Sequence, residues 1–175
     1  TDLGGDRKSI VLNLGGGVVT DLGSFVACTF KRGIDFINVP TTLLSMVDAS
    51  VGGKNGVDLG NLKNQIGIIR EPKAVLIDTA FLSSLSAREM RSGLAEMLKH
   101  GLIADRTYWD KFKNLKDLNT EDLDNLIFEV SAGFNNVSLT CAEAKFTRKN
   151  VNAVTSMKSL VFCITSLIIP GSGLS

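Results

Sequence analysis

The stretch Ser9-Ile10-Val11-Leu12-Asn13-Leu14-Gly15-Gly16-Gly17 decides the fold of this chain. Its apolar run predicts a buried strand, which ends in three glycines. A helix is predicted to follow from Asp21 to Phe30, with four large apolar side chains on one side: Leu22, Phe25, Val26 and Phe30. A strand, a glycine turn and a helix in this order form the first unit of a parallel α/β sheet.

The same alternation continues downstream. Asp35 to Val39 predicts a second strand, which Pro40 stops. A helical stretch around Leu43 to Asp48 and a glycine-rich loop from Val51 to Gly60 come next, and Ala74 to Asp78 predicts a third strand. Strands that alternate with helices imply a parallel sheet.

After the third strand the pattern becomes helical. Ser86 and Glu89 form a capping box, and the helix that they open is predicted to run to about Ile103. Further helices are predicted from Tyr108 to Leu115 and from Glu121 to Ser131. We therefore expect an α/β domain over residues 1–79 and a helical domain over residues 80–175. The segment after about residue 131 is atypical, because it contains a single acidic residue.

The composition indicates the class of protein to which the chain belongs. The chain has 175 residues, of which 44% are hydrophobic and 21% are charged, and its net charge is +1. These values predict a globular protein and give no reason to expect a nucleic acid or a membrane surface as partner. Three scattered cysteines without a C-x-x-C pattern suit a reducing compartment, so we expect a cytoplasmic location.

The run from Pro40 to Lys54, followed by Lys63 and Asn64, concentrates hydroxyls, a carboxylate, a Gly-Gly turn and two lysines. Such groups can hold a polar, anionic small molecule. Thr41 and Thr42 follow a strand, at the edge where ligands bind in open α/β sheets. A plain helix N-cap pair is an equally good interpretation of the threonines, and a lone loop lysine is usually only solvated.

The glycine turn from Gly15 to Gly17 lies between a strand and a helix. Such a turn brings backbone N–H groups and a helix N-terminus close to a phosphate. It is not the G-x-G-x-x-G fingerprint, because Thr20 takes the place of the third glycine. A tight structural turn explains it equally well, and Asp21 has an alternative role as a helix N-cap. Together with the downstream run, the turn favours a nucleotide-assisted enzyme that acts on a phosphorylated substrate.

Glu96, Lys99 and His100 share one predicted helix at spacings that place them on neighbouring faces. Glu96 and His100 can be two metal ligands. His100 is the only histidine of the chain, and a lone histidine is more often a surface or satisfied residue. Glu96 and Lys99 can equally form a helix salt bridge.

Taken in order, these motifs resemble the 3-dehydroquinate synthase family of sugar phosphate cyclases. The resemblance covers about residues 6–112 and rests on G-G-G-V-x-x-D-L-x-x-F (15–25), R-G-I (32–34), P-T-T-L-L-x-x-V-D-x-S-x-G-G-K (40–54), K-N-x-x-G (63–67) and R-E-x-x-x-G-x-x-E-x-x-K (88–99). It implies an α/β, Rossmann-like parallel sheet, incomplete in this chain, followed by the start of an α-helical domain.

The resemblance also implies cofactors and site residues. The cofactors are NAD and a divalent Zn²⁺ or Co²⁺ ion. The implied NAD positions are Gly16, Gly17, Val18, Val19, Thr20, Asp21, Thr41, Thr42, Leu44, Lys63, Phe81, Leu82, Ser83, Ser84 and Glu89. The implied catalytic and substrate-binding positions are Asp48, Lys54, Asn64, Lys99 and Arg32. Arg32 matches an arginine that reaches the active site of a neighbouring subunit, which implies a homodimer. Glu96 matches the acidic metal ligand, whereas His100 matches no ligand of the family.

The implied activity is that of a carbon–oxygen lyase in the shikimate pathway of aromatic amino acid biosynthesis. The enzyme converts a phosphorylated seven-carbon keto acid, DAHP, to 3-dehydroquinate and phosphate, and NAD acts as a catalyst that removes and returns a hydride. Two alternatives stay open. One is another sugar phosphate cyclase, such as a 2-deoxy-scyllo-inosose or valiolone-type synthase, and the other is a non-catalytic remnant.

The resemblance stops at both ends of the chain. The family completes its metal site with two downstream histidines, and no histidine follows His100 here. The first N-terminal strands and a D-G-E-type segment are also missing. We therefore expect a truncated, fragmentary or frame-shifted product that has no 3-dehydroquinate synthase activity alone, since a zinc site with one protein ligand is not tenable.

Overall fold

The computed structural model describes residues 4–112, 120–133, 139–141 and 160–163. Its centre is a five-stranded sheet in the order β6-β5-β2-β1-β7, in which every pair is parallel. The strands are β1 (Ile10–Gly15), β2 (Asp35–Pro40), β5 (Ala74–Ile77), β6 (Leu139–Cys141) and β7 (Leu160–Cys163). The predicted α/β parallel sheet is thus confirmed. Ile10 pairs with Asp35 and Gly15 with Pro40, so β1 and β2 end at the same edge.

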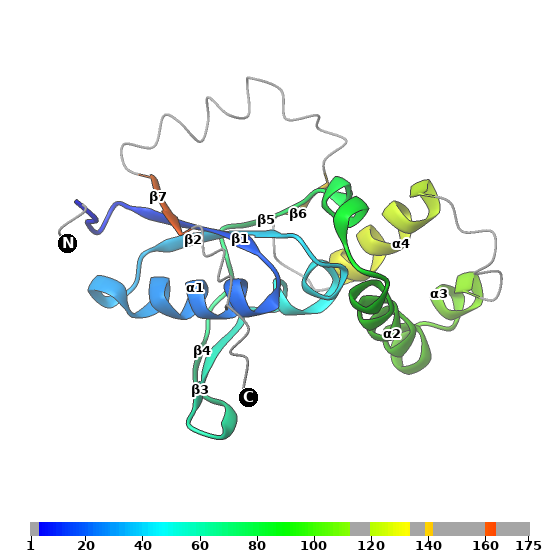
Figure 1. Ribbon diagram of the computed structural model, residues 1–175, viewed down its shortest axis with the longest axis horizontal. Helices are drawn as coiled ribbons and strands as arrows, with labels where there is room; N and C mark the ends of the chain where they lie inside the picture. Colours follow the sequence, from blue (N-terminus) through cyan, green and yellow to red (C-terminus); the bar gives the residue numbers. More distant parts are fainter. Residues whose placement is uncertain (1–3, 113–119, 134–138, 142–159, 164–175) are drawn as a thin grey trace, which may run out of the picture.

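Helix α1 (Gly17–Thr29) lies along one face of the sheet (Figure 1). The predicted helix start at Asp21 is wrong, because the helix begins directly in the glycine turn. The predicted apolar face is also wrong, since Leu22 and Val26 are exposed. The buried face instead carries small residues, namely Thr20, Gly23, Ser24, Ala27 and Cys28.

Close packing of α1 on the sheet explains this choice of small residues. A Cβ atom on Gly23 would lie 1.9 Å from Oδ1 of Asn13 in β1. The Asn13 side-chain amide donates to the Asn38 carbonyl oxygen at 2.9 Å and to the Ser24 hydroxyl at 3.2 Å. A buried polar network therefore joins β1, β2 and α1, and only small side chains fit above it.

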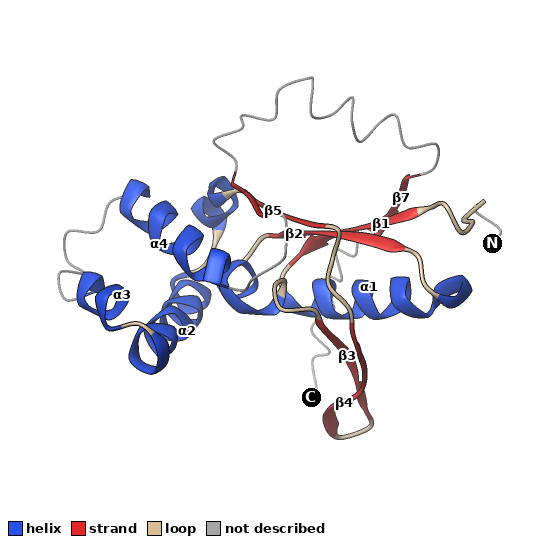
Figure 2. Cartoon of the chain, turned by 180° about the vertical axis from the view of Figure 1, so that it is seen from behind, coloured by secondary structure: helices blue, strands red, loops and turns tan. Residues whose placement is uncertain are grey.

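The predicted glycine-rich loop over residues 51–60 is wrong. Lys54–Leu59 form β3 and Leu62–Ile69 form β4, an antiparallel hairpin that projects away from the sheet (Figures 1 and 2). Gly60, with φ at 58°, opens the two-residue turn between the strands. At the base, the Asn55 amide donates to the carbonyls of Gly53 (3.0 Å) and Arg70 (2.8 Å), which ties the two strands together.

The remaining described elements are helical, and the longer ones gather at one end of the sheet (Figure 2). The short ones are η1 (Phe30–Arg32), η2 (Ser45–Ala49) and η3 (Thr79–Ser84), and the longer ones are α2 (Ala87–Ala104), α3 (Arg106–Lys111) and α4 (Thr120–Gly133). The Ser86 hydroxyl accepts from the N–H of Glu89 at 3.3 Å, as the predicted capping box requires at its first residue. Residues 113–115 of the predicted third helix lie outside the described residues.

One apolar core joins η2, β5 and the helices. Leu43, Met46, Met97 and Ile127 are fully buried in it. A Cβ atom on Gly93 would lie 2.4 Å from Cγ of Leu43, so α2 packs directly on the turn that precedes η2. This contact fixes the position of α2 relative to the edge of the sheet. The domain boundary near residue 80 stays a prediction, and no helix in the described ranges is long and apolar enough to cross a membrane.

Candidate functional site

The glycine turn, the end of β2 and η2 meet at the carboxyl edge of the sheet. The N–H of Thr41 donates to the carbonyl of Gly15 at 2.9 Å. A Cβ atom on Gly16 would lie 3.1 Å from Cγ2 of Thr42, and one on Gly17 would lie 3.2 Å from the Cβ of Ala49. A side chain at either position would push these neighbours away by a few tenths of an ångström, so glycine favours the close approach. The helix N-terminus is left in the position that suits a phosphate group.

Both interpretations of the threonines have a place in this arrangement. The Thr42 hydroxyl accepts from the N–H of Ser45 at 3.2 Å, so Thr42 caps the following helical turn. Thr41 lies beside the glycine turn through its backbone. The contact of either residue with NAD stays a prediction. Thr20, by contrast, is buried and its hydroxyl donates to the carbonyl of Gly17 at 2.9 Å.

Asp48 lies in η2, a π-helical turn, and the surrounding hydrogen bonds hold that turn in place. The N–H of Ser50 donates to the carbonyl of Ser45 at 3.0 Å, which is the wide bond of a π-helix. The amide of Asn38 donates to the carbonyl of Ser50 at 3.1 Å, and the Ser131 hydroxyl donates to the carbonyl of Met46 at 3.0 Å. Hydrogen bonds from the sheet and from α4 thus hold the turn in place. Turns of this type recur at functional sites.

A cavity of about 540 Å³ lies between this edge and the hairpin. Asp21 and Asp48 line it from α1 and η2, and Lys54 and Asn64 line it from β3 and β4. The structure therefore brings together four residues that come from three separate sequence motifs. Asn64 has a φ of 53°, and its N–H donates to the Asp58 carboxylate at 2.8 Å, which fixes its unusual backbone.

One carboxyl group of this cavity, that of Asp21, has a perturbed pKa. Burial, and to a lesser extent the charge of Asp48, raises the pKa of Asp21 to about 6. The alternative role of Asp21 as an N-cap is wrong, because Gly16 is the N-cap of α1 and Asp21 lies in its second turn. Asp21 is instead a cavity carboxyl that gains or loses its proton at mildly acidic pH.

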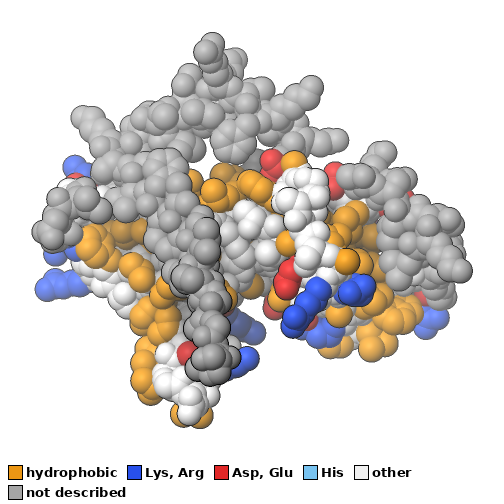
Figure 3. Space-filling view, in the orientation of Figure 1, with side chains coloured by type: hydrophobic (Ala, Val, Ile, Leu, Met, Phe, Trp, Pro, Cys, Tyr) orange, Lys and Arg blue, Asp and Glu red, His pale blue; other side chains and the backbone are white. Residues whose placement is uncertain are grey.

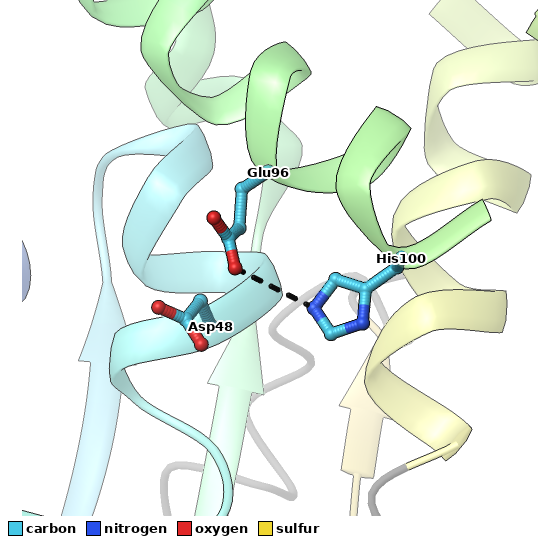
Figure 4. Close-up of side chains that lie close together, drawn as sticks. All are labelled: Asp48, Glu96 and His100. Atoms are coloured by element: carbon cyan, nitrogen blue, oxygen red, sulfur yellow. Dashed lines mark ion pairs between the residues drawn. The ribbon is translucent and has the colours of Figure 1, made fainter. Parts of the chain in front are cut away.

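A second group of side chains adjoins Asp48 (Figure 4). Glu96 and His100 extend from α2 toward Asp48, and one donor atom from each of the three residues lies within 4.8 Å of the other two. Nε2 of His100 is 3.8 Å from Oε1 of Glu96. The predicted salt bridge from Lys99 to Oε1 of Glu96 is confirmed, and this hydrogen bond raises the pKa of Lys99. Two carboxylates and an imidazole form a donor set that fits a divalent metal ion.

Arg32 lies elsewhere. It follows the C-terminal end of α1, whereas the glycine turn is at the N-terminal end of this 13-residue helix. At 1.5 Å per residue, the helix separates them by about 20 Å. Arg32 is exposed, with a φ of 74°, and Lys31 before it also has a positive φ of 47°. Arg32 is not among the residues that line the cavity.

The remaining implied NAD positions lie on several different elements. Lys63 is exposed on β4 and Glu89 is exposed in the first turn of α2, while Leu44 is half-buried beside η2. In η3, Phe81 and Leu82 pack on the core and the two serines are exposed. Val18 is 81% exposed at the start of α1, and Val19 is half-buried. Their contacts with NAD stay predictions.

The hairpin forms one wall of the cavity, and it is the main feature of the site that the sequence motifs did not predict. Gly56, Gly67 and Ile68 line the cavity from its two strands. The signal was the Gly60-Asn61 pair between two β-prone runs, a known two-residue hairpin turn. The interpretation of this region as a loop overlooked that pair.

Comparisons with known proteins identify the family. The family model described as "3-dehydroquinate synthase N-terminal" matches residues 1–92. The 3-dehydroquinate synthase of Prochlorococcus marinus is 54% identical over 114 residues, which are 65% of this chain and 31% of that protein. That of Sulfolobus acidocaldarius is 52% identical over 109 residues, 62% of this chain and 31% of that protein. The chain thus spans about a third of the length of these curated relatives.

Solved structures give the same fold. A 2-epi-5-epi-valiolone synthase from Streptomyces hygroscopicus subsp. jinggangensis 5008, with NAD⁺ and Zn²⁺ bound, has a TM-score of 0.66 at 34% identity, over 74% of this chain and 37% of that one. A 2-deoxy-scyllo-inosose synthase with carbaglucose-6-phosphate, NAD⁺ and Co²⁺ has a TM-score of 0.66 at 30% identity, over 75% of this chain and 38% of that one. The match of more than half of the residues to the family model, on a Rossmann-like sheet with a glycine turn at its edge, shows that this chain belongs to the 3-dehydroquinate synthase family.

Proposed function

We propose that the chain serves the reaction of 3-dehydroquinate synthase, in which DAHP is converted to 3-dehydroquinate and phosphate. The observation that carries the proposal is the cavity where Lys54 and Asn64 of the hairpin face Asp21 and Asp48 beside the glycine turn. The identity of 52–54% to relatives named 3-dehydroquinate synthase supports this substrate.

In this proposal, each group of residues binds a different part of the cofactor or the substrate, or the metal. When bound, NAD⁺ supplies a hydride acceptor that returns the hydride, and a divalent metal supplies Lewis acidity. The glycine turn and the N-terminus of α1 hold the NAD pyrophosphate. Lys54 and Lys99 hold anionic groups of the substrate through charge-assisted hydrogen bonds, and Asn64 orients them. Asp48 accepts hydrogen bonds from substrate hydroxyls, and Glu96 holds the metal.

The second candidate is another sugar phosphate cyclase. The solved structures named as valiolone and 2-deoxy-scyllo-inosose synthases support it, because they share the fold at 30–34% identity. The lower identity makes it the weaker candidate. The two functions differ in the phosphorylated substrate that they accept.

A chimera tests the proposal directly, because the chain spans about a third of its relatives' length. The matched segment of the Prochlorococcus marinus enzyme is replaced with that of this chain, and phosphate release is measured with NAD⁺ and Zn²⁺. We expect release from DAHP and none from glucose 6-phosphate. A folded chimera that releases no phosphate, or that prefers another sugar phosphate, contradicts the proposal.

A matched pair of lysine variants controls the assay. Lys54→Met removes a cationic group from the cavity wall, and we expect it to abolish phosphate release from the chimera. Lys8→Met removes an exposed lysine that does not line the cavity, and we expect the rate to stay unchanged. Equal losses in both variants contradict the role of Lys54.

We also propose that the protein works as a homodimer in the cytoplasm. Val18, Leu22 and Val26 form an exposed apolar stripe on α1, at 81%, 43% and 47% exposure, and Arg32 follows the same helix. Hydrophobic side chains also gather on the hairpin (Figure 3). Such a surface suits a second copy of the chain. Analytical ultracentrifugation is expected to give a dimer that Leu22→Lys dissociates; a wild-type monomer contradicts this proposal.

A further inference from the structure

We infer that Arg70 is a positioning residue for the candidate site: its side chain holds the base of the β3–β4 hairpin and so keeps Lys54 at the cavity wall. Arg70 is not itself among the residues that line the cavity. The inference rests on the proposed function, because it gives the hairpin a part in substrate binding. The contacts that carry it join the hairpin base to α1 and β2.

Core packing fixes little of the hairpin. All eight residues of β4 are exposed, and Asn55 is the one buried residue of β3. The hairpin projects away from the sheet (Figure 1), and the cavity lies between it and the carboxyl edge of the sheet. The direction of the hairpin therefore depends on contacts at its base. A change in that direction would alter the distance from Lys54 and Asn64 to Asp48 across the cavity.

Arg70 directly follows β4 and closes the base of the hairpin through its backbone. Its N–H donates to the carbonyl of Gly53 at 2.9 Å, and its own carbonyl accepts from the Asn55 amide at 2.8 Å. A Cβ atom on Gly53 would lie 3.0 Å from the carbonyl carbon of Arg70, so the two backbone segments are in contact. Ile69, the residue before Arg70, pairs with Lys54 in the ladder. A movement of Arg70 therefore moves Lys54 as well.

The Arg70 side chain connects this base to the sheet and to α1. Nη2 of Arg70 donates to Oδ1 of Asp35, at the start of β2, at 3.2 Å. A Cβ atom on Gly33 would lie 2.7 Å from Nη1 of Arg70, so the guanidinium lies against the backbone of Gly33. The guanidinium also acts on Cys28 of α1: burial raises the pKa of this thiol, and the charge of Arg70 partly offsets the rise. One planar cation thus joins the hairpin to three other segments.

A second cation on the same carboxylate provides a matched comparison. Nζ of Lys73 lies 3.0 Å from Oδ2 of Asp35. Lys73 lies beyond the hairpin, and its N–H donates to the carbonyl of Phe36 at 2.8 Å, so its backbone is already tied to β2. Arg70 alone of these two cations belongs to the hairpin base. The Arg70 and Asp35 side chains are 37% and 38% exposed, so their pair contributes little to global stability and acts on the direction of the hairpin.

The direction of the hairpin can be measured on the chain as it exists. Residual dipolar couplings of the backbone N–H groups report the orientation of β3 and β4 relative to β1 and β2 in partially aligned, ¹⁵N-labelled protein. In the wild type, we expect one alignment tensor to fit both pairs of strands. In Arg70→Met, we expect the hairpin couplings to shrink while those of the sheet are kept. Lys73→Met is expected to give the wild-type couplings, and urea unfolding is expected to give similar midpoints for all three proteins.

The carboxylate partner is tested by a double-mutant cycle. Asp35→Asn is expected to shrink the hairpin couplings as Arg70→Met does. The double variant is expected to show no further loss, because the two side chains act as one contact. Losses that add in the double variant contradict the part of Asp35 in holding Arg70.

The chimera described above connects this contact to substrate binding. We expect Arg70→Met to raise the KM for DAHP by about 10-fold or more, since a displacement of about 1 Å in a positioning group has effects of this order. The kcat is expected to change little, because Lys54 binds the anionic group in the ground state and the transition state alike. Lys73→Met is expected to leave both constants unchanged.

Unchanged hairpin couplings in Arg70→Met overturn the inference, and so do equal changes in Arg70→Met and Lys73→Met. A loosened hairpin with an unchanged KM in an active chimera also overturns it, because the cavity then does not depend on this contact. A loosened hairpin beside a chimera that releases no phosphate upholds the positioning by Arg70 and contradicts the proposed function. An active chimera with an unmoved hairpin does the opposite.

Discussion

The pKa of Asp21 gives a prediction that can be worked through from the structure. Burial beside Asp48 raises this pKa to about 6, against an ordinary value of 3.8 in the unfolded chain. The folded state therefore binds the proton more tightly. The stabilisation is fully present below about pH 4 and is lost as the pH rises through about 6. Above that pH, the ionised Asp21 opposes folding.

The magnitude follows from the size of the shift. A difference of about two pKa units corresponds to roughly 3 kcal/mol at about 1.4 kcal/mol per unit. The cavity admits water, which screens the two carboxylates, so we expect about half of this value. Asp21→Asn removes the titration. Its free energy of unfolding relative to wild type should rise by about 1.5 kcal/mol between pH 4.5 and pH 7.5.

Urea unfolding at both pH values measures this difference, with the fluorescence of the single tryptophan and circular dichroism as probes. Comparison with wild type cancels the titration of all other groups. The control Glu71→Gln removes an exposed carboxylate and should show a much smaller dependence on pH. If the stability of Asp21→Asn relative to wild type is the same at both pH values, the carboxyl is not buried beside Asp48 and the geometry of the cavity is wrong.

Three further variants test the packing that positions the site. Met97→Ala removes a fully buried side chain of α2 and should destabilise the fold by roughly 2–5 kcal/mol, measured by urea unfolding. Gly93→Ala places a methyl group 2.4 Å from Leu43, so the melting temperature should fall; an unchanged melting temperature contradicts the contact. Ser131→Ala removes the bond to the Met46 carbonyl and should destabilise the fold by about 1–3 kcal/mol in the same unfolding assay.

The sequence by itself determined the elements and the family. The apolar run from Ile10 to Leu14, its three glycines and the following strand predict a parallel sheet from local pattern alone. The capping box at Ser86 marks the start of α2 for the same reason, since these signals act over a few neighbouring residues. The order of the motifs from Gly15 to Lys99 also identified the family, without any knowledge of the distances between these motifs in the folded structure.

Tertiary structure decided which side chains face each other. The buried face of α1 was not predictable from its apolar residues, because the polar network around Asn13 leaves room only for small side chains. The hairpin became a cavity wall because its two strands fold back past α1. Asp48 and His100 are 52 positions apart in the chain, and no local pattern relates them. They meet because Gly93 lets α2 pack against the turn before Asp48, and that long-range contact brings Glu96 and His100 close to Asp48.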